Sequence, residues 1–86
     1  MNIQKMMQQE LEALRIEASS GGGMVAVEMS GTKEILSIKI DPVCVDPKDV
    51  ETLEDLMLAA CREAARQVDE AVQKKTSAML GGMLGT

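Results

Sequence analysis

The chain has 86 residues, a length that fits one small domain. It contains no Phe, Trp or Tyr, and Met supplies 8 of its apolar residues, so the core that one copy could bury is thin. The net charge of −5 argues against a strongly basic nucleic-acid or membrane-surface protein, but it leaves room for a local basic patch. The missing His excludes Ser–His and Cys–His nucleophile pairs.

The sequence offers no chemistry of the kind that enzymes and metalloproteins use. Its two cysteines, Cys44 and Cys61, match no CxxC spacing and predict reduced packing residues. No cluster of metal ligands stands out, so we expect no cofactor and no small-molecule substrate. The chain has no run of about 18 apolar residues and no apolar leader block, so we expect a cytoplasmic protein without a membrane partner.

Residues 1–18 predict the first helix. Apolar side chains recur at helical spacing along one face, at Ile3, Met7, Leu11, Leu14 and Ala18. This stripe is as narrow as a coiled-coil seam, which favours packing against a partner helix rather than against a broad core. Residues 19–23 have the sequence Ser-Ser-Gly-Gly-Gly and predict a flexible break.

Residues 24–45 predict a sheet. Apolar and polar residues alternate over 24–30 and again over 34–40, and Gly31-Thr32 lies between them as a turn. The expected structure is an antiparallel β-hairpin with one apolar face. Pro42 ends the second strand, and Val43–Val45 is a candidate third strand. A lone hairpin is not stable in water, so this sheet needs helix cover or more strands.

Residues 47–77 predict a long second helix, for which Asp46 is the expected N-cap and Pro47 the first helical residue. Thr52 is a second candidate cap. This helix would be about 45 Å long, whereas a compact domain of this size is about 30 Å across. Part of it must therefore project or pack on a second subunit. Residues 78–86 are rich in Gly and Met without periodicity, and we expect a mobile tail there.

The ordered set of segments resembles the YbaB/EbfC family of small bacterial nucleoid-associated proteins over nearly the whole chain. The first two segments that carry the resemblance are the Met/Gln/Glu-rich first helix and the Gly-rich break. They are followed by a strand of the form G-x-V-x-V-x-x-x-G at Gly23–Gly31 and by a strand that ends in I-D-P at Ile40–Pro42. The L-E-D-L block Leu53–Leu56 then leads into an Ala-rich helix and a Gly/Met/Leu tail. The resemblance implies an α+β fold. Its parts would be an N-terminal helix, an antiparallel hairpin or three-stranded sheet, and a long C-terminal helix.

The resemblance also implies a tweezer-like homodimer with a shared sheet, and duplex DNA as the partner in the cytoplasmic nucleoid. The candidate DNA-binding residues are six basic side chains on the two predicted helices: Lys5, Arg15, Arg62, Arg66, Lys74 and Lys75. Their contacts would be mainly to backbone phosphates. For Arg66 and Lys74 a second interpretation is intrahelical ion pairing with Glu70 at four-residue spacing.

Two functions therefore compete. The first is a DNA-binding protein with a role in nucleoid organisation and gene regulation. The second is a dimeric adaptor that captures a protein partner on Met- and Ala-rich helix faces and does not bind DNA. An enzyme is not expected.

Overall fold

The computed structural model describes residues 3–83, with side chains described for residues 3–78. The chain forms a helix α1 (Ile3–Ala13), three strands β1 (Arg15–Ser20), β2 (Val25–Ser30) and β3 (Ile35–Ile40), and a long helix α2 (Val50–Met83). Short 3-10 turns, η1 (Gly21–Gly23) and η2 (Pro42–Cys44), lie before β2 and after β3. The α+β class predicted from the sequence is confirmed.

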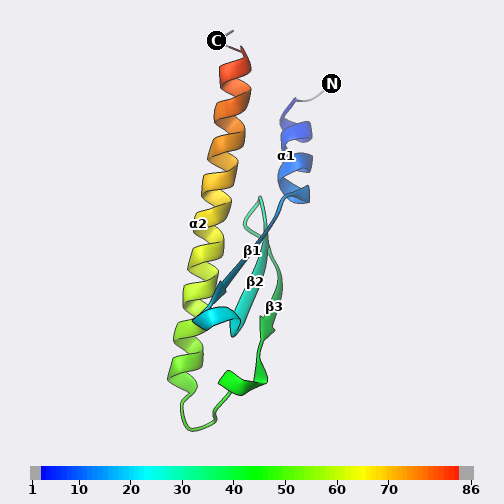
Figure 1. The fold of residues 1–86 in the computed structure, drawn as a ribbon. Helices are drawn as coiled ribbons and strands as arrows, with labels where there is room; N and C mark the ends of the chain where they lie inside the picture. The colour runs from blue at the N-terminus through cyan, green and yellow to red at the C-terminus, as the bar shows by residue number, and fades with distance from the viewer. Residues whose placement is uncertain (1–2, 84–86) are drawn as a thin grey trace.

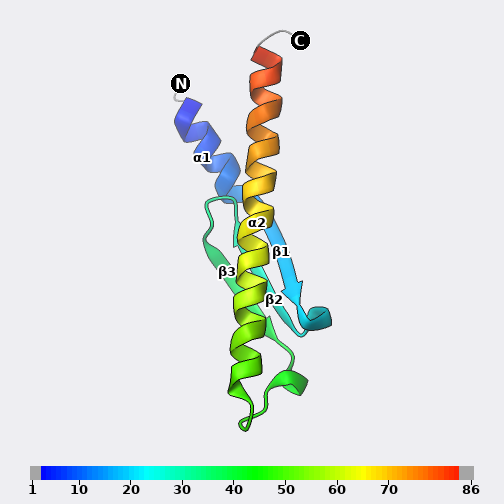
Figure 2. The same ribbon diagram turned by 90° about the vertical axis from the view of Figure 1, so that its left-hand side faces the viewer.

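The three strands form one antiparallel sheet in the order β1-β2-β3, and α2 runs across it and far beyond it (Figure 1). Figure 2 shows α1 beside the upper half of α2 and inclined away from it, with the start of α1 and the end of α2 at the same end of the molecule. The extents of 58 × 25 × 15 Å and the radius of gyration of 16.6 Å describe an elongated shape. A compact chain of this length would have a radius near 12 Å.

The core lies between α2 and the first two strands. Every second residue of β2 is buried in this core: Val25, Val27 and Met29. The α2 residues that face the core include Ala60 and Ala64, whose small side chains let the helix lie close to the strand. Ala18 faces the same core from β1, where it pairs with Val27.

The predicted first helix was wrong beyond Ala13, because residues 15–20 form the strand β1. The helix ends where Gly31 in the β2–β3 turn donates its N–H to the carbonyl oxygens of Leu11, at 2.9 Å, and Leu14, at 3.1 Å. Beyond that point Ile16 and Ala18 alternate with polar residues and pair with β2. Long-range strand pairing therefore overrides the helical spacing of the apolar residues.

The other predicted boundaries shift in smaller ways. The predicted break at 19–23 is wrong for Ser19 and Ser20, which end β1, and only Gly21–Gly23 forms the turn between β1 and β2. The candidate strand Val43–Val45 is wrong because Pro42–Cys44 forms a 3-10 turn. The N-cap of α2 is Asp49, whose carboxylate accepts hydrogen bonds from the N–H and hydroxyl of Thr52, so the helix begins at residue 50 rather than 47. Helix α2 continues past Ser77 to Met83, so the start of the expected tail is helical, and residues 84–86 lie outside the described residues.

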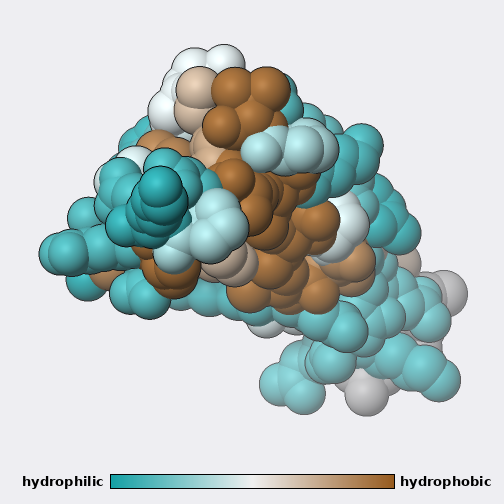
Figure 3. Space-filling model, turned by 90° about the horizontal axis from the view of Figure 1, so that it is seen from below, coloured by the Kyte–Doolittle hydropathy of each residue, from teal (hydrophilic) through white to brown (hydrophobic). Residues whose placement is uncertain are grey.

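Strand β3 is the edge of the sheet that α2 does not cover. Its apolar residues stay exposed, with 47% of Ile35 and 41% of Ile38 accessible, and the exposed surface continues to Val43, which is 80% accessible. Figure 3 looks at the molecule from below and shows apolar surface gathered into one region. We give the name β3 apolar patch to the exposed apolar residues of β3 and of the segment that follows it, which are Ile35, Leu36, Ile38, Ile40, Val43 and Val45. Exposed patches of this kind mark interaction surfaces.

Candidate nucleic-acid interface

The candidate basic residues fall into two groups along the molecule. Lys5 lies on α1, and Lys74 and Lys75 lie on the part of α2 that extends past the sheet. Arg62 and Arg66 lie further back on α2, and Arg15 starts β1. The structure thus brings Lys75 next to α1, but it does not gather all six cations into one patch.

Arg66 is held by two acids of its own helix. Its guanidinium donates to Glu63 at 2.6 Å and to Glu70 at 3.0 Å. The hydrogen bond from Arg66 lowers the pKa of the Glu63 carboxyl to about 2, and the same pair raises the pKa of the Arg66 guanidinium above its usual range. The structure therefore shows the predicted ion pair between Arg66 and Glu70.

Lys74 and Lys75 on the same helix turn make different ion pairs. The ammonium of Lys74 lies 3.4 Å from Glu70, and its hydrogen bond is the largest cause of the lowered pKa of that carboxyl. The ammonium of Lys75 lies 3.7 Å from Glu10 on α1 and so links the two helices. All of these groups are exposed, so each pair is weak and sensitive to salt.

Arg15 and Arg62 lie away from the helix ends. The guanidinium of Arg15 lies 3.3 Å from Glu28 on the neighbouring strand, so it is partly neutralised within the sheet. Arg62 is exposed and makes no ion pair or side-chain hydrogen bond with the described residues. It is therefore the only one of the candidate cations on the described part of α2 that no acid neutralises.

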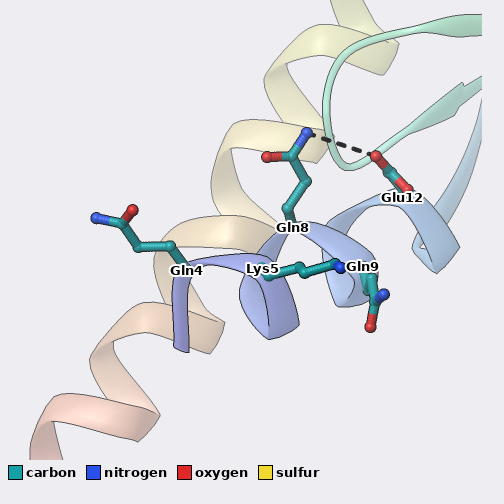
Figure 4. Close-up of a pocket in the computed structure, with 5 residues that line it drawn as sticks. All are labelled: Gln4, Lys5, Gln8, Gln9 and Glu12. Atoms are coloured by element: carbon teal, nitrogen blue, oxygen red, sulfur yellow. Dashed lines mark hydrogen bonds between the residues drawn. The ribbon is translucent and has the colours of Figure 1, made fainter. Parts of the chain in front are cut away.

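Lys5 lines a shallow hollow on the outer side of α1. The hollow has a volume of about 440 Å³, and its other walls are Gln4, Gln8, Gln9 and Glu12 (Figure 4). The side chains come from one helix and leave the hollow open to solvent. Such a surface suits contact with a large partner better than the enclosure of a small ligand.

Charge is segregated along the chain. All 14 acidic residues lie between residues 10 and 70, together with six of the nine basic residues, which gives this part a charge of −8. The remaining three basic residues are Lys5, Lys74 and Lys75, and the segments that hold them, 1–9 and 71–86, contain no acid. We call these two segments the distal segments. Their described parts, α1 up to Gln9 and α2 from Ala71, lie at the same end of the molecule (Figure 1).

Sequence reasoning missed two acids that shape this surface. Glu63 stands three residues before Arg66, a helical spacing that could have identified it. Glu10 had no such signal, because its proximity to Lys75 depends on how α1 folds back beside α2. Within residues 3–83 no group of three acidic or Cys side chains could hold a metal ion. In the same range, no helix combines the length and apolar character that a membrane span requires.

Comparison with known proteins identifies relatives along the full length of this fold. The chain is 52% identical to a nucleoid-associated protein of Koribacter versatilis, over 90% of this chain and 76% of the relative. It is 49% identical to a nucleoid-associated protein of Clostridium novyi, over 93% of this chain and 75% of the relative. The crystal structure of an uncharacterized protein from Helicobacter pylori matches with a TM-score of 0.74 at 23% identity, over 87% of each chain, and thus shares the fold.

Residues 1–83 match the YbaB/EbfC DNA-binding family. That match spans both helices, the sheet and the distal segments up to residue 83, and the relatives from Koribacter versatilis and Clostridium novyi are both named nucleoid-associated proteins. The chain therefore belongs to the YbaB/EbfC DNA-binding family of bacterial nucleoid-associated proteins.

Proposed function

We propose that this protein binds duplex DNA as a homodimer, at the nucleoid in the bacterial cytoplasm, and that it contributes to nucleoid organisation and gene regulation. The observation that carries the DNA contact is the charge segregation. A chain with a net charge of −5 meets a polyanion best where its acids are fewest, and the two distal segments contain no acid of their own; Glu70 and Glu10 are the acids that lie beside Lys74 and Lys75. Catalysis has no part in this function.

The contacts are mainly to phosphates. Lys5, Lys74 and Lys75 are the residues of the distal segments that supply positive charge, and lysine binds phosphate as a point charge without reading sequence. Arg62 adds an unneutralised cation further along α2. Arg15 and Arg66 contribute less, because they lie outside the distal segments, among the acids of the chain, and the carboxylates of Glu28 and Glu63 hold their guanidinium groups.

The homodimer is supported by the β3 apolar patch. An edge strand whose Ile35 and Ile38 stand exposed is a template for association with a second chain. The small core of a single copy gives the same expectation, because Val25, Val27 and Val68 are its largest fully buried side chains. Two copies joined through β3 would share a sheet and keep both pairs of helices free to project.

Fluorescence anisotropy with a labelled duplex at rising salt tests the DNA contact. The wild-type protein should bind at about 50 mM salt, and its affinity should fall steeply by about 200 mM as counterions are released. Replacing Lys74 and Lys75 together by Ala should weaken binding and lower the slope of log K against log salt by roughly one for each phosphate that the variant no longer neutralises.

The matched control replaces Lys39 and Lys48 by Ala. Both lysines are exposed and make no ion pair with the described residues, and both lie outside the distal segments, so the net charge changes equally. The control should change affinity much less than the Lys74/Lys75 variant. Absence of binding at low salt, or binding without a salt slope, would contradict the proposed function. Equal effects of the two double variants would contradict the assignment of the contact to the distal segments.

A further inference from the structure

The outer face of α1 is lined by exposed amide side chains. Helix α1 contributes no buried residue, and three of the chain's five Gln residues lie in its first two turns. Gln4 and Gln8 follow one another at four-residue spacing, and Gln9 lies beside them next to Lys5 (Figure 4). We call Gln4, Gln8 and Gln9 the amide face.

Amides and cations do different work at a DNA surface. A lysine is attracted to any phosphate, whereas a neutral amide gains little from phosphate charge. A glutamine amide carries a donor and an acceptor side by side, which matches the N6 donor and N7 acceptor that adenine shows in the major groove. An α-helix about 10–12 Å across also fits that groove, which is about 12 Å wide.

The surroundings of the amide face leave it able to approach bases. Two acids lie near these amides: Glu12 lines the same hollow, and the Glu10 carboxylate lies 3.7 Å from the ammonium of Lys75. The Nε2 of Gln8 donates to Glu12 at 3.5 Å, which orients the amide and leaves its oxygen and one N–H available. Lys5 stands beside these amides and can contact a phosphate while they reach into the groove.

Base reading also requires that α1 keep a fixed direction. The N–H of Gly31 bonds to two carbonyl oxygens at the end of α1, those of Leu11 and Leu14. On the inner side of the helix, Met7 and Leu11 face Val72 of α2 across a cleft of only about 20 Å³. The Gly31 hydrogen bonds thus fix the C-terminal end of the helix, while its amide face stays open.

We propose that the amide face of α1, through Gln8 and Gln9, reads adenine in the major groove of duplex DNA. This proposal rests on the proposed function, because it requires that the distal segments contact a duplex. It adds that the contact selects sequence and names the side chains responsible.

Selection from a pool of randomised duplexes tests the proposal, with the wild-type protein and with Gln8→Ala/Gln9→Ala compared in parallel. The wild type should enrich adenine at fixed positions, and the variant should lose that enrichment. In the selected duplex, replacing each enriched adenine by 7-deazaadenine removes N7 without changing the base pair. This should weaken wild-type binding on the order of tenfold and leave binding by the variant almost unchanged.

Lys5→Ala is the matched control on the same helix. It should weaken binding to all duplexes alike and reduce the salt slope without changing the selected sequence. Circular dichroism should show all variants folded, since every replaced side chain is exposed. Binding without adenine enrichment, or enrichment that survives in the double variant, would overturn base reading alone. No binding to any duplex would overturn the proposed function with it.

Discussion

At the scale of single residues, Gly31 has a role that only glycine can fill. A Cβ added there would lie 2.5 Å from the carbonyl oxygen of Leu11, which is backbone and cannot move aside cheaply. The same close approach lets the Gly31 N–H bond to that oxygen and end α1. One missing side chain therefore sets where α1 stops and in which direction it leaves the sheet.

Gly31→Ala should destabilise the fold by about 2 kcal/mol or more, because the clash must be relieved by moving α1 away from the β2–β3 turn. Thermal unfolding should show a midpoint lowered by roughly 10 °C. The comparison is Gly22→Ala, where φ is +69° but nothing lies within 4 Å of the added Cβ, so the cost is backbone strain of about 1 kcal/mol. A Gly31→Ala protein that is as stable as the Gly22→Ala protein would disprove the close-approach argument.

The Glu63–Arg66 pair predicts a pH dependence. The pKa of Glu63 is lowered from 4.5 to about 2 by the hydrogen bond from Arg66. A lowered pKa in the folded state means that the carboxylate stabilises the fold above about pH 4.5 and that this contribution is lost as the pH falls toward 2. NMR titration of the side-chain carboxyl should give a midpoint near 2 in the wild type. In Arg66→Gln the midpoint should return toward the ordinary value, and a midpoint that does not move would show that another group sets it.

At the scale of elements, α1 and α2 are joined where they project by the exposed pair Glu10–Lys75. In the free protein this pair takes up part of the positive charge that DNA would use. Glu10→Gln should therefore raise DNA affinity several-fold, since it releases Lys75 as well as removing a negative charge. Glu17→Gln makes the same charge change in β1, and it should have a smaller effect in the same anisotropy titration. Equal gains for the two variants would mean that the pair does not restrain Lys75.

The sequence predicts those helices and strands whose structure is decided by their own residue pattern. The β2–β3 hairpin follows from the alternation of Val25, Val27 and Met29, and the long helix follows from its Ala-rich apolar side; the structure confirms both. Strand β1 could not be found in this way, because Leu11, Leu14 and Ala18 fit a helix as well, and only pairing with β2 decides between the two structures. The same limit applies to the DNA-binding candidates. Helical spacing could have predicted that Glu63 pairs with Arg66, but no local pattern could have predicted that Glu10 pairs with Lys75.

At the scale of the whole molecule, the β3 apolar patch predicts the assembly. Ile38→Lys places a charge in the patch and should convert the dimer to monomer in analytical ultracentrifugation at low micromolar concentration. Since the proposed dimer would complete a thin core, the variant should also unfold at a lower temperature, and the wild-type midpoint should rise with protein concentration.

Ser37→Lys is the control for this substitution, because Ser37 is the neighbouring exposed residue of β3 and its side chain points to the opposite face of the strand. It should remain a dimer. A wild-type protein that is a folded monomer at low micromolar concentration would contradict the assembly outright.

The segregation of charge also governs how the molecule can stand on DNA. At physiological salt, screening limits the interaction between exposed charges to about 8 Å, whereas the longest dimension of the molecule is 58 Å. A molecule that approaches with its helix ends keeps the acids of its sheet region beyond the reach of the phosphates, and only the acids beside Lys74 and Lys75, Glu70 and Glu10, come close. A molecule that lies along the duplex brings that region within range and is repelled. On the proposed function, bound copies should therefore stand upright on the duplex with the acidic end pointing outward, and repulsion between those like-charged ends should limit how closely neighbouring copies can lie.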